Sequence, residues 1–239
     1  MMDKIEEFLK INKVKDRFEL WYNFLLLNKL KTVAELGVYK GEFAKVLLDK
    51  CSSIEKYYMV DPWRKLDDWN KPANTSSAEF ENIFKEALNK TYFAKSKRTI
   101  LKGKTIEVIN EIEDESLDFI YIDGDHTLRG ISIDLLTSWN KVSENGFVAG
   151  DDFCPSIWQH STKFEPTLIF PFALYFAESV DRKIYALPFN QFLISKENKG
   201  FEFVNLSGQD YSRKTLLQQF KGFKEQKEND LVSRLFKRF

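Results

Sequence analysis

Acidic residues stand at the ends of short apolar runs in the first two thirds of the chain. If these runs are parallel strands, their carboxyl ends meet at one edge of a sheet, where ligands of open α/β sheets bind. A rim of carboxylates would repel a pyrophosphate group and suits a cationic ligand, a divalent metal, or both. The residues concerned are Glu35, Asp61, Asp123, Asp125, Asp151 and Asp152.

Two glycines follow the first of these acidic residues. Residues 35–41 read ELGVYKG, an acidic residue and GxxxG rather than the dinucleotide-binding GxGxxG. Glycines in such a turn let a ligand lie against the backbone because no Cβ is in the way. Asp61, at the end of the second run, suits a carboxylate that accepts both hydroxyls of a ribose. A nicotinamide-dependent oxidoreductase therefore fits the sequence poorly.

Strand-like and helical segments alternate along the chain and would position these residues. Short apolar runs cover residues 32–36, 57–60, 99–101, 119–122 and 147–149. Segments with helical spacing of apolar residues lie near 42–50, 78–90, 105–112 and 127–142. Alternation of this kind predicts a parallel sheet with helices on both of its faces. We expect Arg129 and Asp134, in the last of these helices, to be surface charges.

The two ends of the chain have other patterns. Residues 5–27 have helical spacing, and an irregular aromatic segment at 154–165 precedes a predicted helix at 166–179. Two or three strand-like runs follow within residues 184–205, and two of them predict an antiparallel hairpin at the sheet edge. Residues 208–239 predict a basic amphipathic helix.

The composition argues against several classes of protein. Of 239 residues, 43% are hydrophobic, which is enough for a sizeable core. Lys+Arg and Asp+Glu both total 36, so the positive field usual in nucleic-acid binding is missing. No apolar stretch is long enough to span a bilayer, and the first residues lack the apolar region of a signal peptide. Cys51 and Cys154 form no CxxC motif, which argues against a disulfide scaffold or a zinc–thiolate site. We expect a cytoplasmic protein.

Over roughly residues 32–152 the chain resembles class I S-adenosylmethionine-dependent methyltransferases. The resemblance rests on the segment 35–41, on Asp61-Pro62-Trp63, and on the strand-end acids Asp123 and Asp151. The nearest pattern is that of macrocin-type and other small-molecule O-methyltransferases, here IDGDH at 122–126 and NGFVAGDDF at 145–153. Asn145 stands where these relatives usually have the first glycine of a pair.

The resemblance also implies a fold and a domain organisation. The fold would be a Rossmann-like, doubly wound, mostly parallel α/β sheet of seven strands with one antiparallel edge strand. N- and C-terminal helices would flank the sheet. The chain would then divide into a helical element at 1–30, a methyltransferase domain at 31–207 and the basic helix at 208–239.

The cofactor implied by the resemblance is S-adenosylmethionine, whose positive sulfonium and lack of phosphate agree with the acidic rim. In the family pattern Glu35 and Gly37 lie near the amino acid end of the cofactor, and Asp61 binds its ribose. Residues after the third strand lie near the adenine, although Lys104 stands where an acidic or small polar residue is common. The implied cofactor-binding residues are Glu35, Gly37, Gly41, Asp61, Trp63, Gly103, Lys104, Thr105 and Asp123.

Metal-dependent members of the family hold Mg²⁺ with one carboxylate after strand four and an acidic pair after strand five. Asp123, Asp151 and Asp152 match those places, and His126 falls where such enzymes place a general base. Mg²⁺ would lower the pKa of an acceptor hydroxyl, and His126, with Asp123 beside it, would take the proton. A solvated loop or helix cap remains the alternative for Asp151 and Asp152, as does helix capping for His126.

These features predict O-methylation of a hydroxyl on a small molecule or a sugar, with or without Mg²⁺. The expected partner is a small-molecule acceptor rather than nucleic acid, and a homo-oligomer is compatible with the sequence. Two alternatives remain. An RNA methyltransferase would bind RNA through the basic C-terminal helix with strong salt dependence. A non-catalytic module would bind S-adenosylmethionine without turnover.

Overall fold

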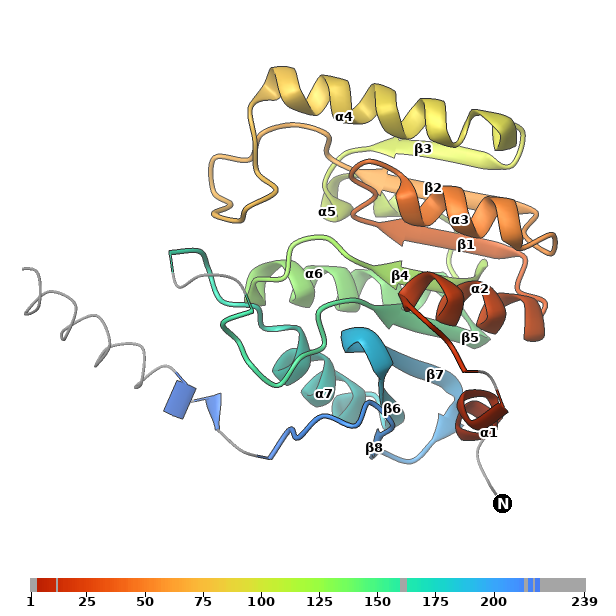
Figure 1. The fold of residues 1–239 in the computed structure, drawn as a ribbon, viewed down its shortest axis with the longest axis vertical. Helices are drawn as coiled ribbons and strands as arrows, with labels where there is room; N and C mark the ends of the chain where they lie inside the picture. The colour runs from red at the N-terminus through yellow and green to blue at the C-terminus, as the bar shows by residue number, and fades with distance from the viewer. Residues whose placement is uncertain (1–3, 12, 160–162, 213–214, 217, 220–239) are drawn as a thin grey trace, which may run out of the picture.

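An eight-stranded sheet forms the centre of the molecule (Figure 1). The computed structural model describes residues 4–11, 13–159, 163–212, 215–216 and 218–219. The order of the strands across the sheet is β3-β2-β1-β4-β5-β7-β6-β8. Their bounds are β1 (Thr32–Leu36), β2 (Lys56–Asp61), β3 (Arg98–Lys102), β4 (Leu117–Ile122), β5 (Val142–Gly150), β6 (Arg182–Leu187), β7 (Gln191–Lys199) and β8 (Glu202–Asn205).

The directions of the strands confirm the predicted fold class, with two corrections. The strands from β3 to β5 run parallel to one another. β7 runs antiparallel to β5 and to β6, whereas β8 pairs parallel with β6. The sheet therefore has eight strands rather than seven, and the reversed strand lies inside the sheet rather than at its edge. The reason is that the short connection Pro188–Asn190 folds β7 back between β6 and β5, and β8 then covers the outer side of β6.

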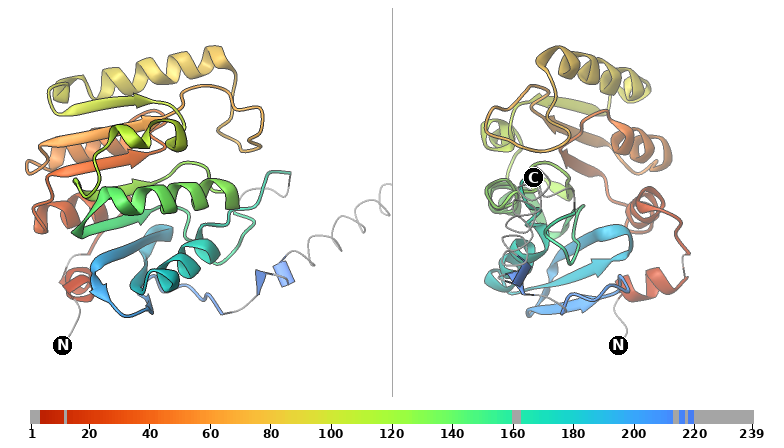
Figure 2. Two further views of the ribbon diagram at one scale, coloured as in Figure 1. Left: turned by 180° about the vertical axis from the view of Figure 1, so that it is seen from behind. Right: turned by 60° about the vertical axis from the view of Figure 1, so that its left-hand side comes forward.

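Helices cover both faces of the sheet. Figure 1 shows α2 and α3 in front of it, and the left view of Figure 2 shows α6 and α7 on the opposite face. The α-helices are α1 (Lys4–Ile11), α2 (Arg17–Leu27), α3 (Glu42–Lys50), α4 (Ser77–Lys90), α5 (Thr105–Val108), α6 (Leu128–Ser138) and α7 (Ile169–Ser179). Short 3₁₀ helices are η1 (Tyr92–Ala94), η2 (Ile109–Glu111), η3 (Trp139–Lys141) and η4 (Pro188–Asn190).

The helical spacing noted over residues 5–27 belongs to two helices, α1 and α2. The Asp16 side chain accepts a hydrogen bond from the Glu19 N–H at 2.8 Å and caps a new helix, α2. α2 then packs on the sheet through Trp21, whose ring lies 5.3 Å from that of Phe119 in β4. Both side chains are fully buried, and a large apolar side chain buried in this way contributes roughly 1.5–3 kcal/mol. This packing fixes the position of the first residue of α2.

Two apolar layers hold the helices to the sheet. Val33 of β1 belongs to the layer under α1 to α4, and its neighbour Ala34 belongs to the layer under α5 to α7, because successive strand residues face opposite sides. Strands covered on both faces become nearly continuous apolar runs. This is why the sequence revealed them as short apolar segments.

Backbone hydrogen bonds continue past the strand ends and place the turns that carry the polar residues. The Gly37 N–H donates to a carbonyl of β2 at 2.8 Å, and the Asp123 N–H donates to the last residue of β1 at 2.7 Å. In the same way, Asp151 donates to the end of β4 at 3.0 Å, and Gly103 donates to Asp61 at 3.1 Å. The strand order reverses its direction between β1 and β4, so this edge is the point where doubly wound sheets bind ligands.

The structure does not test the predicted C-terminal helix or the predicted division into domains. The basic helix at 208–239 lies largely outside the described residues, and the proposed domain division stays a prediction. Within the described ranges, no helix is long and apolar enough to cross a membrane.

Candidate active site

A pocket of about 220 Å³ opens at the carboxyl edge of the sheet, above β1, β2, β3 and β4. Six of the nine predicted cofactor-binding residues line it: Gly37, Asp61, Gly103, Lys104, Thr105 and Asp123. They come from four different strand ends, and the register of the sheet brings them together. The structure therefore places most of the predicted cofactor residues around one cavity.

The backbone at Gly37 leaves no room for a side chain. Its φ of +92° is left-handed, and a Cβ at this position would lie 2.1 Å from the carbonyl oxygen of Asp123. Only glycine combines this conformation with so close an approach between the turns after β1 and β4. The turn after β1 therefore packs directly against the turn after β4 in the pocket wall.

Asp61 is a buried carboxylate in the pocket wall. Only 7% of its surface is exposed. One oxygen accepts the Tyr39 N–H at 2.8 Å, and the other accepts the Trp63 N–H at 2.7 Å. Burial raises the pKa of Asp61 to about 6, against these backbone hydrogen bonds, which lower it. Asp61 is thus held in one orientation and is largely ionised at neutral pH.

Three predicted cofactor residues do not line the pocket. The fully buried Glu35 points toward the apolar layer under α1 to α4, and it accepts a hydrogen bond from the Tyr57 hydroxyl at 2.7 Å. Burial raises the pKa of Glu35 to about 8. Gly41 precedes α3 and packs against α4. Trp63 supports the wall from behind, because its indole N–H donates to the Tyr39 carbonyl at 2.8 Å.

One of the two residues that we expected on the surface is buried. Arg129 and Asp134 of α6 both line the pocket, but the Arg129 side chain is 52% exposed as expected, whereas Asp134 is only 5% exposed. Burial raises the pKa of Asp134 to about 7. The sequence held one signal for this position, because Asp134 lies among the apolar residues of the buried face of α6. A charge inside an apolar stripe indicates a polar cavity or a paired group.

The predicted metal ligands lie beside the pocket, and protein groups already occupy them. Arg17 at the start of α2 bridges Asp123 and Asp151, at 3.0 Å from the Asp123 Oδ2 atom. The other Asp151 oxygen accepts a hydrogen bond from Gln191 at 2.5 Å. Asp152 binds the side chains of Gln159 and His126.

This arrangement does not fit a divalent metal. Each carboxylate oxygen of Asp123, Asp151 and Asp152 faces a nitrogen of another side chain, whereas Mg²⁺ needs near-ideal octahedral oxygen ligands. Across the described part of the chain, no group of three His, Cys, Asp or Glu side chains has an arrangement that could hold a metal ion. No step of the chemistry is therefore assigned to Mg²⁺.

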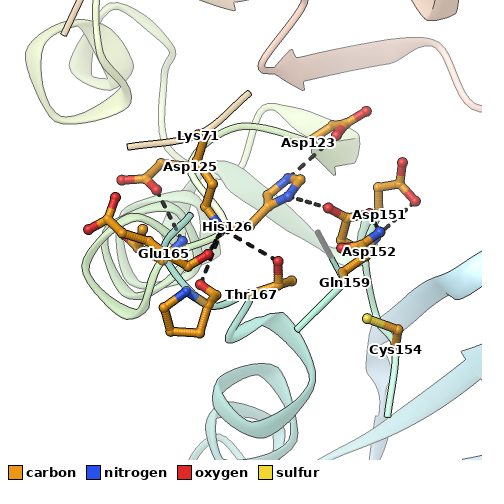
Figure 3. A network of polar contacts seen from close by, with 12 residues as sticks. Lys71, Asp123, Asp125, His126, Asp151, Asp152, Cys154, Gln159, Glu165 and Thr167 are labelled. Atoms are coloured by element: carbon orange, nitrogen blue, oxygen red, sulfur yellow. Dashed lines mark hydrogen bonds and ion pairs between the residues drawn. The ribbon is translucent and has the colours of Figure 1, made fainter. Parts of the chain in front are cut away.

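His126 lies between two carboxylates (Figure 3). Its Nδ1 atom pairs with Asp152, and its Nε2 atom lies 3.5 Å from Asp123 Oδ1. Nε2 is buried and makes no hydrogen bond to any described residue. Burial alone would lower the pKa of His126, but the contacts with Asp123 and Asp152 outweigh it and raise the pKa to about 10. At neutral pH the imidazole is therefore protonated, which the prediction of a ready general base did not anticipate.

Two segments meet over this cluster, one at residues 62–76 and the other within residues 153–159 and 163–168 (Figure 3). The Lys71 ammonium donates to the Glu165 carbonyl at 2.8 Å and to the Pro166 carbonyl at 3.2 Å. Lys71 is only 6% exposed, and burial lowers its pKa. In the first loop, the Trp69 indole also donates to Asp125 at 2.9 Å. Sequence reasoning found neither loop contact, because nothing in the motifs links these segments.

The fold and the pocket define a class of protein. A doubly wound sheet carries a glycine turn after β1 and a buried carboxylate at the end of β2, and both line one pocket that lacks the dinucleotide glycine motif. Residues 34–153, half of the chain, match the family model described as a methyltransferase domain. The chain therefore belongs to this family of methyltransferase domains.

Solved structures share the fold at low sequence identity. A protein assigned as a caffeoyl-CoA O-methyltransferase from Staphylococcus aureus is 16% identical, with a TM-score of 0.56 over 83% of this chain and 93% of that one. An O-methyltransferase from Bacillus cereus in complex with S-adenosylhomocysteine is 13% identical, with a TM-score of 0.52 over 81% and 90%. The O-methyltransferase TomG from Streptomyces achromogenes, in complex with S-adenosylmethionine, is 9% identical, with a TM-score of 0.54 over 84% and 91%. No curated protein sequence matches the chain.

Proposed function

We propose that this chain transfers the methyl group of S-adenosylmethionine to a hydroxyl oxygen of a small molecule. The observation that carries the proposal is the position of the His126–Asp152 pair directly beside Asp123, which is part of the pocket wall. Asp123 thus lines the proposed nucleoside pocket and also lies next to a group that can take a proton. O-methyl transfer needs both, because the acceptor oxygen must lose its proton as it attacks the methyl group.

The residues of the pocket suit this cofactor. Asp61 lines the pocket as a buried, backbone-oriented carboxylate, and its two oxygens would accept the two ribose hydroxyls. Gly37 lets the turn after β1 pack against the turn after β4 in the pocket wall, and Asp123 places a negative charge where this wall meets the cluster. When bound, S-adenosylmethionine supplies an electrophilic methyl group on its positive sulfonium.

His126 is the proposed proton acceptor, with Asp152 holding the orientation of its ring. In the neutral imidazole, Nδ1–H would donate to Asp152, and the lone pair of Nε2 would be free to take a hydroxyl proton. Because the pKa of His126 is raised to about 10, the neutral form is a small fraction at pH 7. Positioning of the two reactants would then supply much of the remaining rate.

The first test is calorimetric titration with S-adenosylhomocysteine. We expect micromolar affinity, about −8 kcal/mol, for the wild-type chain. Asp61→Ala should weaken it roughly 100-fold, because two charge-assisted hydrogen bonds are lost at about 1.5 kcal/mol each. Asp67→Ala is the matched control, because Asp67 lies in the loop that follows Asp61 and 97% of its side chain is exposed. Absence of binding by a folded wild-type chain would refute the proposed cofactor.

The acceptor class is tested with tritium-labelled S-adenosylmethionine. The protein is incubated with a panel of small molecules that carry phenolic, catecholic or sugar hydroxyls, and with total RNA as the comparison. Label in an ether of one of the small molecules supports the proposal. Label only in RNA would favour the alternative of an RNA methyltransferase. Cofactor binding without transfer to any of them would favour a non-catalytic module.

A further inference from the structure

Helix α2 places one positive charge between the two strand ends that carry the predicted metal ligands. Arg17 is the first residue of α2, and its Nη1 atom contacts Asp123 after β4 and Asp151 after β5. These aspartates are 106 and 134 residues away from it in the sequence. The guanidinium is only partly buried, with 31% of the side chain exposed.

A second contact fixes α2 in this position through the same carboxylate. Gln191 donates to Asp151 Oδ1 at 2.5 Å, and its own carbonyl oxygen accepts the Trp21 indole N–H at 2.7 Å. The Tyr121 hydroxyl donates to that oxygen as well, at 2.7 Å. Trp21 and Gln191 are both fully buried. Asp151 is therefore bound on one oxygen by the anchor of α2 and on the other by Arg17.

Asp123 and Asp151 would repel each other without a positive charge between them. In relatives that use a metal, a divalent cation would supply that charge, but here a guanidinium has the position and the contacts. Arginine stays protonated at every pH at which the protein is folded, and its planar donors match carboxylate geometry. Only Nη1 is bonded to another described residue, so the Nη2 and Nε donors have no partner among the side chains that the structure describes.

We propose that the Arg17 guanidinium is the built-in cation of this site, in the place of a divalent metal, and that the chain works without one. The statement about the cation concerns the carboxylates of the free protein and holds independently of the reaction. The statement about metal-independent turnover rests on the proposed function. In this proposal, α2 supplies a positive charge to the site in addition to packing on the sheet.

The test is a titration of the free protein with Mn²⁺ in place of Mg²⁺, followed by calorimetry and by the electron paramagnetic resonance signal of free Mn²⁺. We expect no binding by the wild-type chain up to millimolar Mn²⁺. Arg17→Ala exposes both carboxylates and should bind Mn²⁺ at least tenfold more tightly than the wild type. Adding Asp151→Asn to Arg17→Ala should abolish that gain. Lys31→Ala is the control for a lost positive charge, because the Lys31 side chain is 59% exposed and pairs with the exposed Glu55.

Two further variants keep the test decisive. Arg17→Lys keeps the charge and should stay without Mn²⁺ binding, and Arg17→Gln removes the charge with less change in shape if Arg17→Ala does not fold. Micromolar Mn²⁺ binding by the wild type that is lost in Asp123→Asn would overturn the proposal. So would the lack of any gain in the folded charge-removing variants. These outcomes do not depend on methyl transfer, so failure of the proposed function would be seen separately, in the titration with S-adenosylhomocysteine.

Discussion

The pocket and the carboxylate cluster lie side by side at one edge of the sheet, but they are assembled in different ways. The pocket residues that the sequence predicted stand at or just after the ends of β1 to β4, and backbone hydrogen bonds across the sheet place them. The cluster around His126 also needs side chains from α2, from β7 and from the segment after β5. The first region is thus set by strand register, and the second by pairing of charges from distant segments.

Because of this difference, we expect the two regions to respond differently to substitutions. In the pocket, the restriction lies in the backbone, where Gly37 and Asp123 approach too closely for a side chain. In the cluster, the restriction lies in the balance of charge, because Arg17 and His126 together face three aspartates. Removing a group from the cluster should alter chemistry or ion binding before it alters the fold. The predictions below test this separation in order of decreasing effect.

Substitution of the pocket glycine should have the largest effect. Gly37→Ala adds a Cβ at 2.1 Å from a backbone oxygen in a left-handed conformation, so we expect a loss of roughly 3 kcal/mol or more in the free energy of unfolding. Gly200→Ala is the matched control, because Gly200 has the same φ of +92° with nothing within 4 Å of its Cβ position. It should cost only about 1 kcal/mol. Equal costs in chemical denaturation would mean that the close approach is unimportant.

The proposed proton acceptor should affect rate without affecting the pocket. His126→Gln should lower kcat about 10²- to 10⁴-fold, the usual contribution of a general base, while the affinity for S-adenosylhomocysteine stays within twofold. The wild-type rate should rise with pH, up to tenfold per unit, toward the His126 pKa of about 10. The measurement is the pH profile of kcat with any acceptor found. A profile that is flat from pH 7 to 9 would remove His126 as the base.

The pH dependence of cofactor affinity should depend on Asp61. Its pKa is raised to about 6 in the free protein, chiefly by burial, and ribose hydroxyls donate to the ionised carboxylate. Affinity for S-adenosylhomocysteine should therefore be constant above pH 6 and fall by up to tenfold per unit below it. Calorimetry between pH 4.5 and 8 measures this, and Asp61→Asn should remove the dependence. Affinity that rises on acidification would contradict the assignment.

The contact between the two loops should have the smallest effect. Lys71→Met leaves the carbonyls of Glu165 and Pro166 without their buried donor, at about 1–2 kcal/mol in the free energy of unfolding. Lys65→Met is the control, because Lys65 lies in the same loop and its side chain is 55% exposed. Chemical denaturation compares the two. A Lys71 variant as stable as the control would show that the loops need no such contact.

The sequence by itself determined the fold class, the order of the first five strands and helices, and the turn residues that line the pocket. These follow from local patterns, because parallel strands buried on both faces form nearly continuous apolar runs, and the turns that follow them carry polar residues and glycines. Eight strands rather than seven, and the inward place of β7, depend on which neighbours the last strands pair with, and no local pattern states this.

The tertiary structure alone decided how the charged groups are used. Arg17 reaches its aspartates across more than a hundred residues of sequence, and Asp134 is buried although its residue type suggests a surface position. The protonation of His126 depends on two carboxylates whose distances only the folded chain fixes. Charge interactions act through space and strengthen as water is removed, so the sequence can name the acidic residues of this site but cannot show which cation they hold.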